Sequence, residues 1–256
     1  MTYSVRLVKT FENELPGPAE IMCSHWNEWF HNIFYLLVVK SKDQIVVINS
    51  GPPRDMTIPD EFQRNFAARS VVKIAESDKL PNALEAVGVA PSNVDILVLS
   101  PLVYYTTGNI SLFTKAKICI LRRGWIDFMA PEPYVPRFSR RLFIDDEQLK
   151  WLVTEGWDQI RLLQDEDTIA PGIRSWFAGS HHRSSMAIEI DTAKGTVIFS
   201  DAFFRYDNLD KNIPIGVCEC LEEALRTHDR VRRCASLVLP FVDPEIWIRY
   251  PDGIVA

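Results

Sequence analysis

The sequence predicts a single layered α/β domain. Short apolar runs rich in β-branched residues alternate with amphipathic stretches of helix length, and the order strand-then-helix occurs once in each half of the chain. No low-complexity tract, internal linker or repeat with a period of about 20–50 residues interrupts the 256 residues. We therefore expect residues 1–256 to form one domain.

Eight segments are predicted to be strands, the first because its apolar and polar residues alternate and the others because they are short and mainly apolar: 3–9, 33–40, 44–49, 94–99, 117–121, 186–190, 196–200 and 237–239. The nearly continuous apolar runs among them are typical of strands that are buried on both faces. Residues 41–43 and 191–195 are predicted turns between strands. Pro101 follows the fourth strand, which must end there because proline cannot continue a ladder.

Three segments are predicted to be helices: 80–87, 145–155 and 215–233. Gly88 terminates the first of them, as glycine commonly does at a helix end. The second begins with acidic residues, which suit the positive end of the helix dipole. The third is the longest helix that the sequence predicts.

The composition is that of an ordinary globular protein, with 47% hydrophobic and 24% charged residues. Twenty-eight basic and 34 acidic side chains give a net charge of −6. A protein with this charge lacks the excess of positive charge that binds nucleic acid or an anionic membrane. No apolar run approaches the ~20 residues of a membrane span, and the N-terminus lacks the pattern of a signal peptide. Five scattered cysteines favour reduced thiols and a cytoplasmic protein.

Four segments carry a more specific pattern. Residues 45–51 (IVVINSG) are a strand ending in a polar turn, and residues 94–113 (VDILVLSPLVYYTTGNISLF) are a strand, a loop and a helix start. Residues 179–204 hold a turn, a hairpin and a strand ending in Ser-Asp, and residues 239–253 contain Leu-Pro-Phe-Val-Asp-Pro. In order, spacing and flanking apolar residues, these segments resemble the metallo-β-lactamase fold, and within it the N-acyl homoserine lactonase-like hydrolases.

The resemblance covers nearly the whole chain. It implies a four-layer αββα sandwich with the functional site along one edge of the two sheets. Residues 124–138 are rich in aromatic residues and proline, and we expect them to form a loop or cap over one end of the sandwich. A lid over the site and an interface with another subunit are both consistent with such a segment.

The resemblance also implies seven ligand positions for a paired zinc or iron site, which needs nitrogen and oxygen donors at about 2.0–2.2 Å. Asp201 matches the bridging carboxylate, and either Ser180 or, after a one-residue slip, His181 stands at one histidine position. The other five positions have lost their ligands, because His, His, Asp, His and His of the family are here Pro101, Val103, Tyr105, Thr106 and Val242. One carboxylate and at most one imidazole cannot fill such a site, so the sequence predicts no metal and no cofactor.

Two supporting positions of the family differ as well. Asn49 stands where the family has the aspartate of its Asp-Thr-Gly strand end. Phe204 stands where lactonases of this branch often keep a tyrosine that polarises the substrate carbonyl. The inherited hydrolase chemistry therefore lacks supporting groups as well as metal ligands.

Some polar residues remain candidates for metal-independent chemistry. The candidates for acid, base or phenol roles are Asp201, His181, His182 and Tyr105. The candidates for substrate binding are Tyr104, Thr106, Ser180, Arg183, His25 and Trp26. The competing interpretation is structural: residues 181–183 form a polar turn left after metal loss, Asp201 caps a turn, and a tyrosine fills the emptied cavity.

A relocated metal site is a further hypothesis. Cys23, His25 and His31 would share one face if their segment were extended, and thiolate and imidazole are ligands of transition metals. The competing interpretation is that the aromatic residues of this segment line a substrate or subunit pocket.

Two main hypotheses about function follow. In the first, the chain is a degenerate metallo-β-lactamase-like protein, a non-catalytic ligand-binding or structural subunit in a homo-oligomer or beside a metal-bearing relative. Its basis is selective loss, since the segments around each ligand are intact and the ligands are gone. In the second, a metal-independent hydrolase or lyase acts on a lactone-like or acyl substrate in the inherited cavity. Fold alone does not decide between them; both allow a small-molecule ligand, and neither requires nucleic acid or a membrane.

Overall fold

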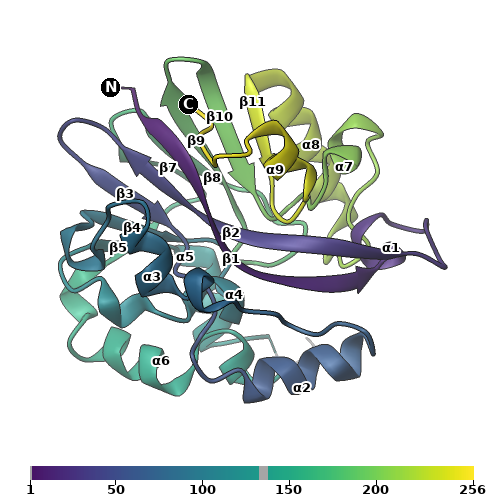
Figure 1. The fold of residues 1–256 in the computed structure, drawn as a ribbon, viewed down its shortest axis with the longest axis horizontal. Coiled ribbons are helices and arrows are strands. Elements are labelled where there is room, and N and C mark those ends of the chain that lie inside the picture. Colours follow the sequence, from purple (N-terminus) through teal and green to yellow (C-terminus); the bar gives the residue numbers. More distant parts are fainter. Residues whose placement is uncertain (1, 133–137) are drawn as a thin grey trace.

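Two mixed sheets face each other in the computed structural model (Figure 1), which describes residues 2–132 and 138–256. The strands of the first sheet, in spatial order, are β1 (Ser4–Pro16), β2 (Trp29–Lys40), β3 (Ile45–Ile48), β4 (Ile96–Leu99), β5 (Lys117–Leu121) and β6 (Ile160–Leu163). Strands β1 to β3 are antiparallel, whereas β3 to β6 are parallel. The strands of the second sheet, in spatial order, are β11 (Leu237–Pro240), β10 (Gly195–Ser200), β9 (Met186–Thr192), β8 (Ile173–Phe177) and β7 (Glu166–Ala170). Only the β10–β11 pair of that sheet is parallel.

The main core lies between the two sheets. Successive side chains of a strand point to opposite faces, so β2 serves two cores at once. Its Leu37 and Val39 pack between the sheets, against side chains of the second sheet such as Ile188, while Leu36 and Val38 face a helical layer. All four β2 residues are buried, which confirms the prediction of strands covered on both faces.

Helices cover the outer face of each sheet. On the first sheet lie α3 (Leu80–Glu85), α5 (Arg122–Met129) and α6 (Asp146–Val153), with α2 (Thr57–Phe66) beyond them; α7 (Tyr206–Asp210) and α8 (Leu221–Cys234) cover the second sheet (Figure 1). Leu84 and Leu152 are fully buried against the first sheet, and Val231 against the second. The four layers confirm the predicted αββα sandwich.

Short elements connect the strands. They are α1 (Gly17–Glu20), α4 (Tyr104–Thr107), α9 (Glu245–Arg249) and 3-10 turns over Glu76–Asp78, Pro91–Asn93, Ile110–Leu112, Arg140–Leu142 and Trp157–Gln159. Strands β1 and β2 extend past the rest of their sheet as a long arm, with α1 at its end (Figure 1). None of the helices in the described part of the chain is both long and apolar enough to span a membrane.

Two helices of the structure can be compared with the ranges that the sequence predicts. The helix predicted over 145–155 is α6, and Asp145 caps it by accepting a hydrogen bond from the backbone N of Gln148 (2.9 Å). The helix predicted over 215–233 begins only at Leu221. The backbone N atoms of Gly216 and Val217 are held instead by the carbonyl of Ala19 (2.9 and 3.1 Å), which fixes the segment before α8 in a non-helical path.

The segment 124–138 is not a loop throughout. Residues 124–129 belong to helix α5, whose Trp125 and Phe128 pack against the core under the first sheet. Residues 133–137 lie outside the described residues. Strands β6, β7 and β8 were not predicted, because their outward faces carry ion pairs such as Arg161–Asp167 (2.8 Å) that interrupt the apolar pattern.

A buried polar network joins the arm to the second sheet. Glu20 is fully buried, and its Oε1 accepts a hydrogen bond from Asn32 Nδ2 (2.8 Å). Arg205 donates to Glu20 Oε2, to Asn32 Oδ1 (2.9 Å) and to the carbonyl of His31 (2.8 Å), and also pairs with Asp243 (3.5 Å). Burial raises the pKa of Glu20 to about 7 despite the opposing effect of Arg205.

The raised pKa of Glu20 predicts a pH-dependent contribution to stability. A carboxyl whose pKa is higher in the folded than in the unfolded state favours folding at low pH, and that contribution is lost as pH rises from about 4.5 to 7. We compare the natural protein with Glu20→Gln, which cannot titrate at this position. The difference between their free energies of unfolding should fall by on the order of 1–3 kcal/mol between pH 4.5 and 7.5. Urea unfolding at a series of pH values measures this difference. Exposed Glu61 provides the control, and an equal slope for Glu61→Gln and Glu20→Gln would contradict the prediction.

Candidate functional site

The four segments singled out in the sequence meet at one edge of the sandwich, where several strands end. Asn49, after β3, accepts a hydrogen bond at its Oδ1 from the backbone N of Ser100, which follows β4 (2.9 Å). Ser100 Oγ in turn accepts from the backbone N of Met186 in β9 (2.8 Å). The backbone N of Val242, after β11, donates to the carbonyl of Phe204, after β10 (3.2 Å). Hydrogen bonds between strand ends thus assemble this edge from segments far apart in the sequence.

Three side chains converge there: Tyr105, His181 and His182. The Oη of Tyr105, in α4, lies 3.4 Å from Nε2 of His181 and 3.3 Å from Nε2 of His182. The two imidazole rings are tilted by 44° to each other, with centroids 3.9 Å apart. Nδ1 of His181 donates to the carbonyl of Val217 (2.9 Å), which leaves its Nε2 as an acceptor.

Burial controls the protonation of this cluster. Desolvation lowers the pKa of His181 to about 4 and lowers the pKa of His182 well below its usual value, so both rings are neutral at pH 7. Burial raises the pKa of Tyr105 well above its usual value, with the charge of Asp201 as the next contribution. A neutral phenol therefore faces two neutral imidazoles.

Asp201 lies deeper, at the end of β10. It is fully buried; its Oδ2 accepts a hydrogen bond from Ser185 Oγ (2.6 Å), and its Oδ1 has no partner among the described residues. Ser185 Oγ also accepts from the backbone N of His182 (3.0 Å) and so connects the carboxyl to the histidines. Desolvation raises the pKa of Asp201 to about 7.

Aromatic rings fill the space around Tyr105. Its ring lies 5.5 Å from that of Phe34 and 5.6 Å from that of Phe241, measured between centroids. Phe204, at the position of the family's tyrosine, meets the ring of His181 edge to face at 5.1 Å. The structure therefore places hydrocarbon against the polar cluster.

The side chains present do not fit a paired metal site. Pro101 and Val242 have no donor atom in their side chains, and Val103 packs with Tyr104 and Leu142. Thr106 Oγ1 donates to the backbone carbonyl of Val103 (2.8 Å). Across residues 2–132 and 138–256, no three His, Cys, Asp or Glu side chains are grouped so that they could hold a metal. We therefore derive no chemistry from the family's metal pair.

The other predicted binding residues are not all part of the cluster. Tyr104 points away from it, with its Oη accepting from Gln63 Nε2 (2.8 Å). Ser180 is buried, and its Oγ lies 3.7 Å from Sγ of Cys218; its neighbour His181 is therefore the side chain that faces the cluster. Arg183 pairs with Glu219 and Glu223 next to the cluster.

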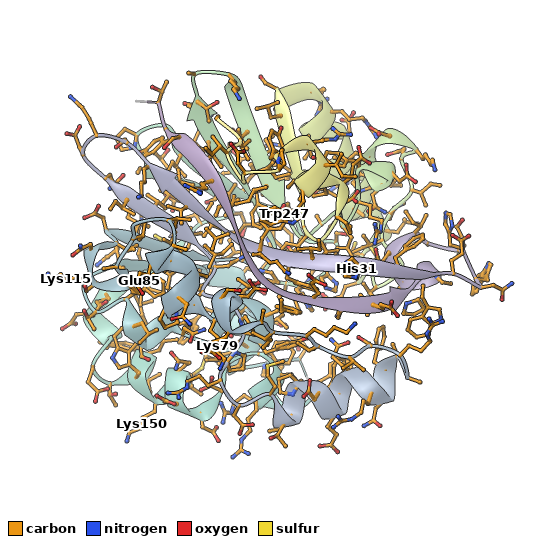
Figure 2. All side chains as sticks on the ribbon, viewed as in Figure 1. His31, Lys79, Glu85, Lys115, Lys150 and Trp247 are labelled. Carbon is orange, nitrogen blue, oxygen red and sulfur yellow. The ribbon has the colours of Figure 1, made fainter. Side chains whose placement is uncertain are left out.

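The segment around His25 lies near the end of the arm. Nδ1 of His25 contacts Oε1 of Glu28 (2.8 Å), and Trp26 is 71% exposed. Cys23 is exposed, and His31, on β2 (Figure 2), contacts Glu12 (3.3 Å). These contacts do not bring Cys23, His25 and His31 together as ligands.

Sequence reasoning missed Ser185 and Glu219, which support the histidines. Oε1 of Glu219 lies 3.9 Å from Nδ1 of His182. Ser185 was visible only as part of the Ser-Ser-Met run before β9, and Glu219 lay in a segment predicted to be helical. Neither has a spacing that signals its role.

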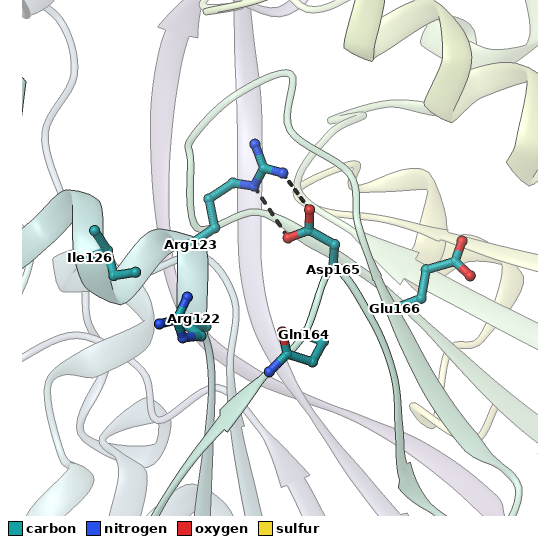
Figure 3. Close-up of a pocket in the computed structure, with 6 residues that line it drawn as sticks. All are labelled: Arg122, Arg123, Ile126, Gln164, Asp165 and Glu166. Carbon is teal, nitrogen blue, oxygen red and sulfur yellow. Dashed lines mark hydrogen bonds and ion pairs between the residues drawn. The ribbon is translucent and has the colours of Figure 1, made fainter.

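Two surface clefts lie elsewhere. One, of about 520 Å³, is lined by Arg122, Arg123, Ile126, Gln164, Asp165 and Glu166. Figure 3 shows that Arg123 reaches across it to pair with Asp165. The other, of about 930 Å³, is bordered by residues of α2, α3 and α6. Neither cleft is lined by the Tyr105, His181 and His182 cluster.

Comparison with solved structures identifies known proteins that share this fold. No family model and no curated protein matches the sequence. Among solved structures, an N-acyl homoserine lactone hydrolase with N-hexanoyl-L-homoserine bound at its catalytic metal centre is 15% identical over 100% of both chains, with a TM-score of 0.80. A probable metal-dependent hydrolase from Staphylococcus aureus is 12% identical over 94% of this chain and 89% of its own, with a TM-score of 0.72. AidC, a dizinc quorum-quenching lactonase, is 10% identical over 98% of this chain and 89% of its own (TM-score 0.68). The chain has the fold of these metallo-β-lactamase-like hydrolases.

Proposed function

We propose that this chain is a non-catalytic member of the metallo-β-lactamase fold that serves as a ligand-binding or structural subunit beside a metal-bearing relative. The observation that carries the proposal is the donor set at the sheet edge. The fold and the loops around the inherited site are kept, while Pro101, Val103 and Val242 put hydrocarbon at ligand positions. Loss of ligands and of supporting groups within a retained fold is expected when a scaffold is kept and its catalysis is not.

The packing of the cluster supports the same conclusion. A lactonase needs room for a substrate carbonyl next to its nucleophile, but here Tyr105 lies against Phe34, Phe241 and the two imidazoles. The cluster therefore lacks an open reaction centre.

The test is native mass spectrometry of the tagged chain purified from its own cells, with partner peptides sequenced. We expect a complex with a relative that keeps the complete His-x-His-x-Asp-His loop, and no lactone hydrolysis by this chain alone. A relative carrying an equally degenerate loop, or turnover of acyl lactones by this chain alone, would overturn the proposal.

One observation favours the second candidate, a metal-independent hydrolase or lyase. Asp201 has a pKa of about 7, and one of its carboxyl oxygens has no partner within the described parts of the chain, so it can exchange protons at neutral pH. In that case Asp201→Asn should abolish the turnover of a lactone or acyl substrate, whereas Asp127→Asn should leave that turnover intact. Both variants should keep the circular dichroism spectrum of the natural protein. Equal turnover in the two variants would exclude this candidate.

A further inference from the structure

The larger of the two surface clefts described above has a volume of about 930 Å³ and is bordered by residues of α2, α3 and α6, on the helix-covered side of the first sheet (Figure 1). Ligand pockets of proteins commonly have volumes of about 300–1,000 Å³. We propose that this cleft binds a small neutral molecule with a carboxamide group, whose C=O accepts from Gln148 Nε2 and whose N–H donates to Asn109 Oδ1. Neither residue stands at one of the seven ligand positions of the inherited metal site, so the inference goes beyond the proposed function.

Gln148 contributes the hydrogen-bond donor. It is 4% exposed and lies in the first turn of α6, where its Oε1 accepts a hydrogen bond from the backbone N of Ser111 (2.8 Å). Because a backbone N–H can only donate, this contact fixes which end of the side-chain amide is the oxygen. The other end, Nε2, carries two protons and has no hydrogen-bond partner among residues 2–132 and 138–256.

Asn109 contributes the hydrogen-bond acceptor. It is 8% exposed, and its Nδ2 donates to the carbonyls of Ser50 and Pro52, both at 2.8 Å. These two carbonyls use both protons of the amide, so Oδ1 is the opposite end. Oδ1 does not cap the 3-10 turn that follows, and no residue in the described part of the chain donates to it.

Both free atoms are open to the cleft. Gln148 and Asn109 line it, and neither atom is among the enclosed polar atoms that lack a partner in the described structure. Side-chain amides that are this buried nearly always complete their hydrogen bonds. A donor and an acceptor left free in one cleft are satisfied by water until a ligand replaces it, and a carboxamide is the simplest group that offers one C=O and one N–H.

The wall that carries these two amides is rigid. A Cβ on Gly108 would lie 2.1 Å from the backbone N of Pro53, so two loops meet there with no room for a side chain. Ser111, whose backbone N holds Gln148, lies only two residues after Asn109. The donor and the acceptor are therefore held in place before a ligand arrives, which reduces the entropy that binding must lose.

The rest of the lining indicates the kind of molecule that carries the carboxamide. Lys79 pairs with Glu76, and Arg141 with Asp146, each at 2.5 Å, so these charges are compensated without a ligand. A neutral molecule with an apolar body fits walls of this kind. The apolar residues that line the cleft include Pro52, Pro53, Pro59, Pro81, Ile58 and Leu80.

The test is a titration of the full, nitrogen-15-labelled chain with N-acetyl-L-leucine N-methylamide, followed by two-dimensional NMR. This probe offers amide groups and an apolar side chain. We expect saturable shifts of the side-chain NH₂ signals of Gln148 and Asn109. The analogue with both amide nitrogens methylated keeps the carbonyls and cannot donate, so it should bind at least about tenfold more weakly.

Gln148→Glu keeps an oxygen that accepts from Ser111 and replaces only the free donor. It should weaken binding of the probe at least about tenfold, and an acidic residue in the first turn of α6 suits the helix dipole. Gln164→Glu is the matched control, because it makes the same change in the other cleft and should leave binding unchanged. The circular dichroism spectrum of both variants should match that of the natural protein.

Three results would overturn the proposal: no saturable shift at Gln148, equal binding of the methylated analogue, or equal binding by Gln148→Glu and Gln164→Glu. The comparison of the two probes uses the natural chain, so it does not depend on the folding of a variant. Complex formation with a relative is measured separately, so a failure here leaves the proposed non-catalytic role untouched.

Discussion

Replacing Arg205 by alanine should lower the free energy of unfolding by about 3–5 kcal/mol, because it removes the cation that pairs with the buried Glu20 carboxyl and leaves several buried hydrogen-bond acceptors without their donor. Glu20 is fully buried, and Arg205 contacts it together with Asn32 and the carbonyl of His31. The guanidinium also lies over the ring of Phe30, with 4.4 Å from its carbon to the ring centroid. Urea unfolding at pH 7 measures the loss.

Arg226 offers the matched control, since it forms an exposed pair with Glu222 on α8. Arg226→Ala should cost less than about 0.5 kcal/mol. Combining Arg205→Met with Glu20→Leu should recover part of the lost stability, because a buried pair can be replaced by apolar residues more cheaply than it can be broken. Similar losses for Arg205→Ala and Arg226→Ala would show that the buried network is not what stabilises the arm.

Phe241→Ala should lower the free energy of unfolding by about 3–5 kcal/mol, through lost burial and the cavity left behind. Phe241 is 2% exposed, and its ring contacts those of Phe34, Tyr105, Phe199 and Phe204. This aromatic cluster fills the region beside Tyr105 and the two histidines, so the same change should loosen Tyr105. Thermal and urea unfolding measure the first effect.

Phe66→Ala is the control, because Phe66 is a 46% exposed residue of α2. It should change the free energy of unfolding by less than about 1 kcal/mol. If Phe241→Ala were as mild as Phe66→Ala, the aromatic cluster would be loosely packed, and the site would hold room for a ligand that the structure does not show.

The layered fold was predictable because its strands are buried on both faces. Near-continuous apolar runs such as 33–40 require cover above and below, which a layered α/β fold provides. The four layers themselves were implied by the resemblance to the metallo-β-lactamase fold. Strands β6 to β8 escaped prediction because their outward side chains, Arg161 and Arg174 among them, form ion pairs that mask the pattern. The helix was predicted to start too early, because residues 215–220 contain glycine, cysteine and β-branched residues, which are poor helix formers. The contact with Ala19 also holds the backbone there in a non-helical path.

The candidate site was predictable in its members and not in its geometry. The sequence identified Tyr105, His181, His182 and Asp201, and the structure places all four at one edge. It did not indicate which of two adjacent tyrosines faces inward. That choice depends on Gln63, a distant residue of α2 that hydrogen-bonds Tyr104 and holds it on the opposite side.

The non-helical segment before α8 lies tightly against the end of the arm. A Cβ on Gly216 would lie 1.7 Å from the carbonyl oxygen of Pro18, so two backbones meet there with no room for a side chain. Ala19 holds the amides of Gly216 and Val217, and the carbonyl of Val217 holds the ring of His181. These contacts link the arm, the segment around Gly216 and the His181 ring, so we expect them to open together in local unfolding. Opening would free Nδ1 of His181 from the Val217 carbonyl and make the other tautomer of the ring accessible.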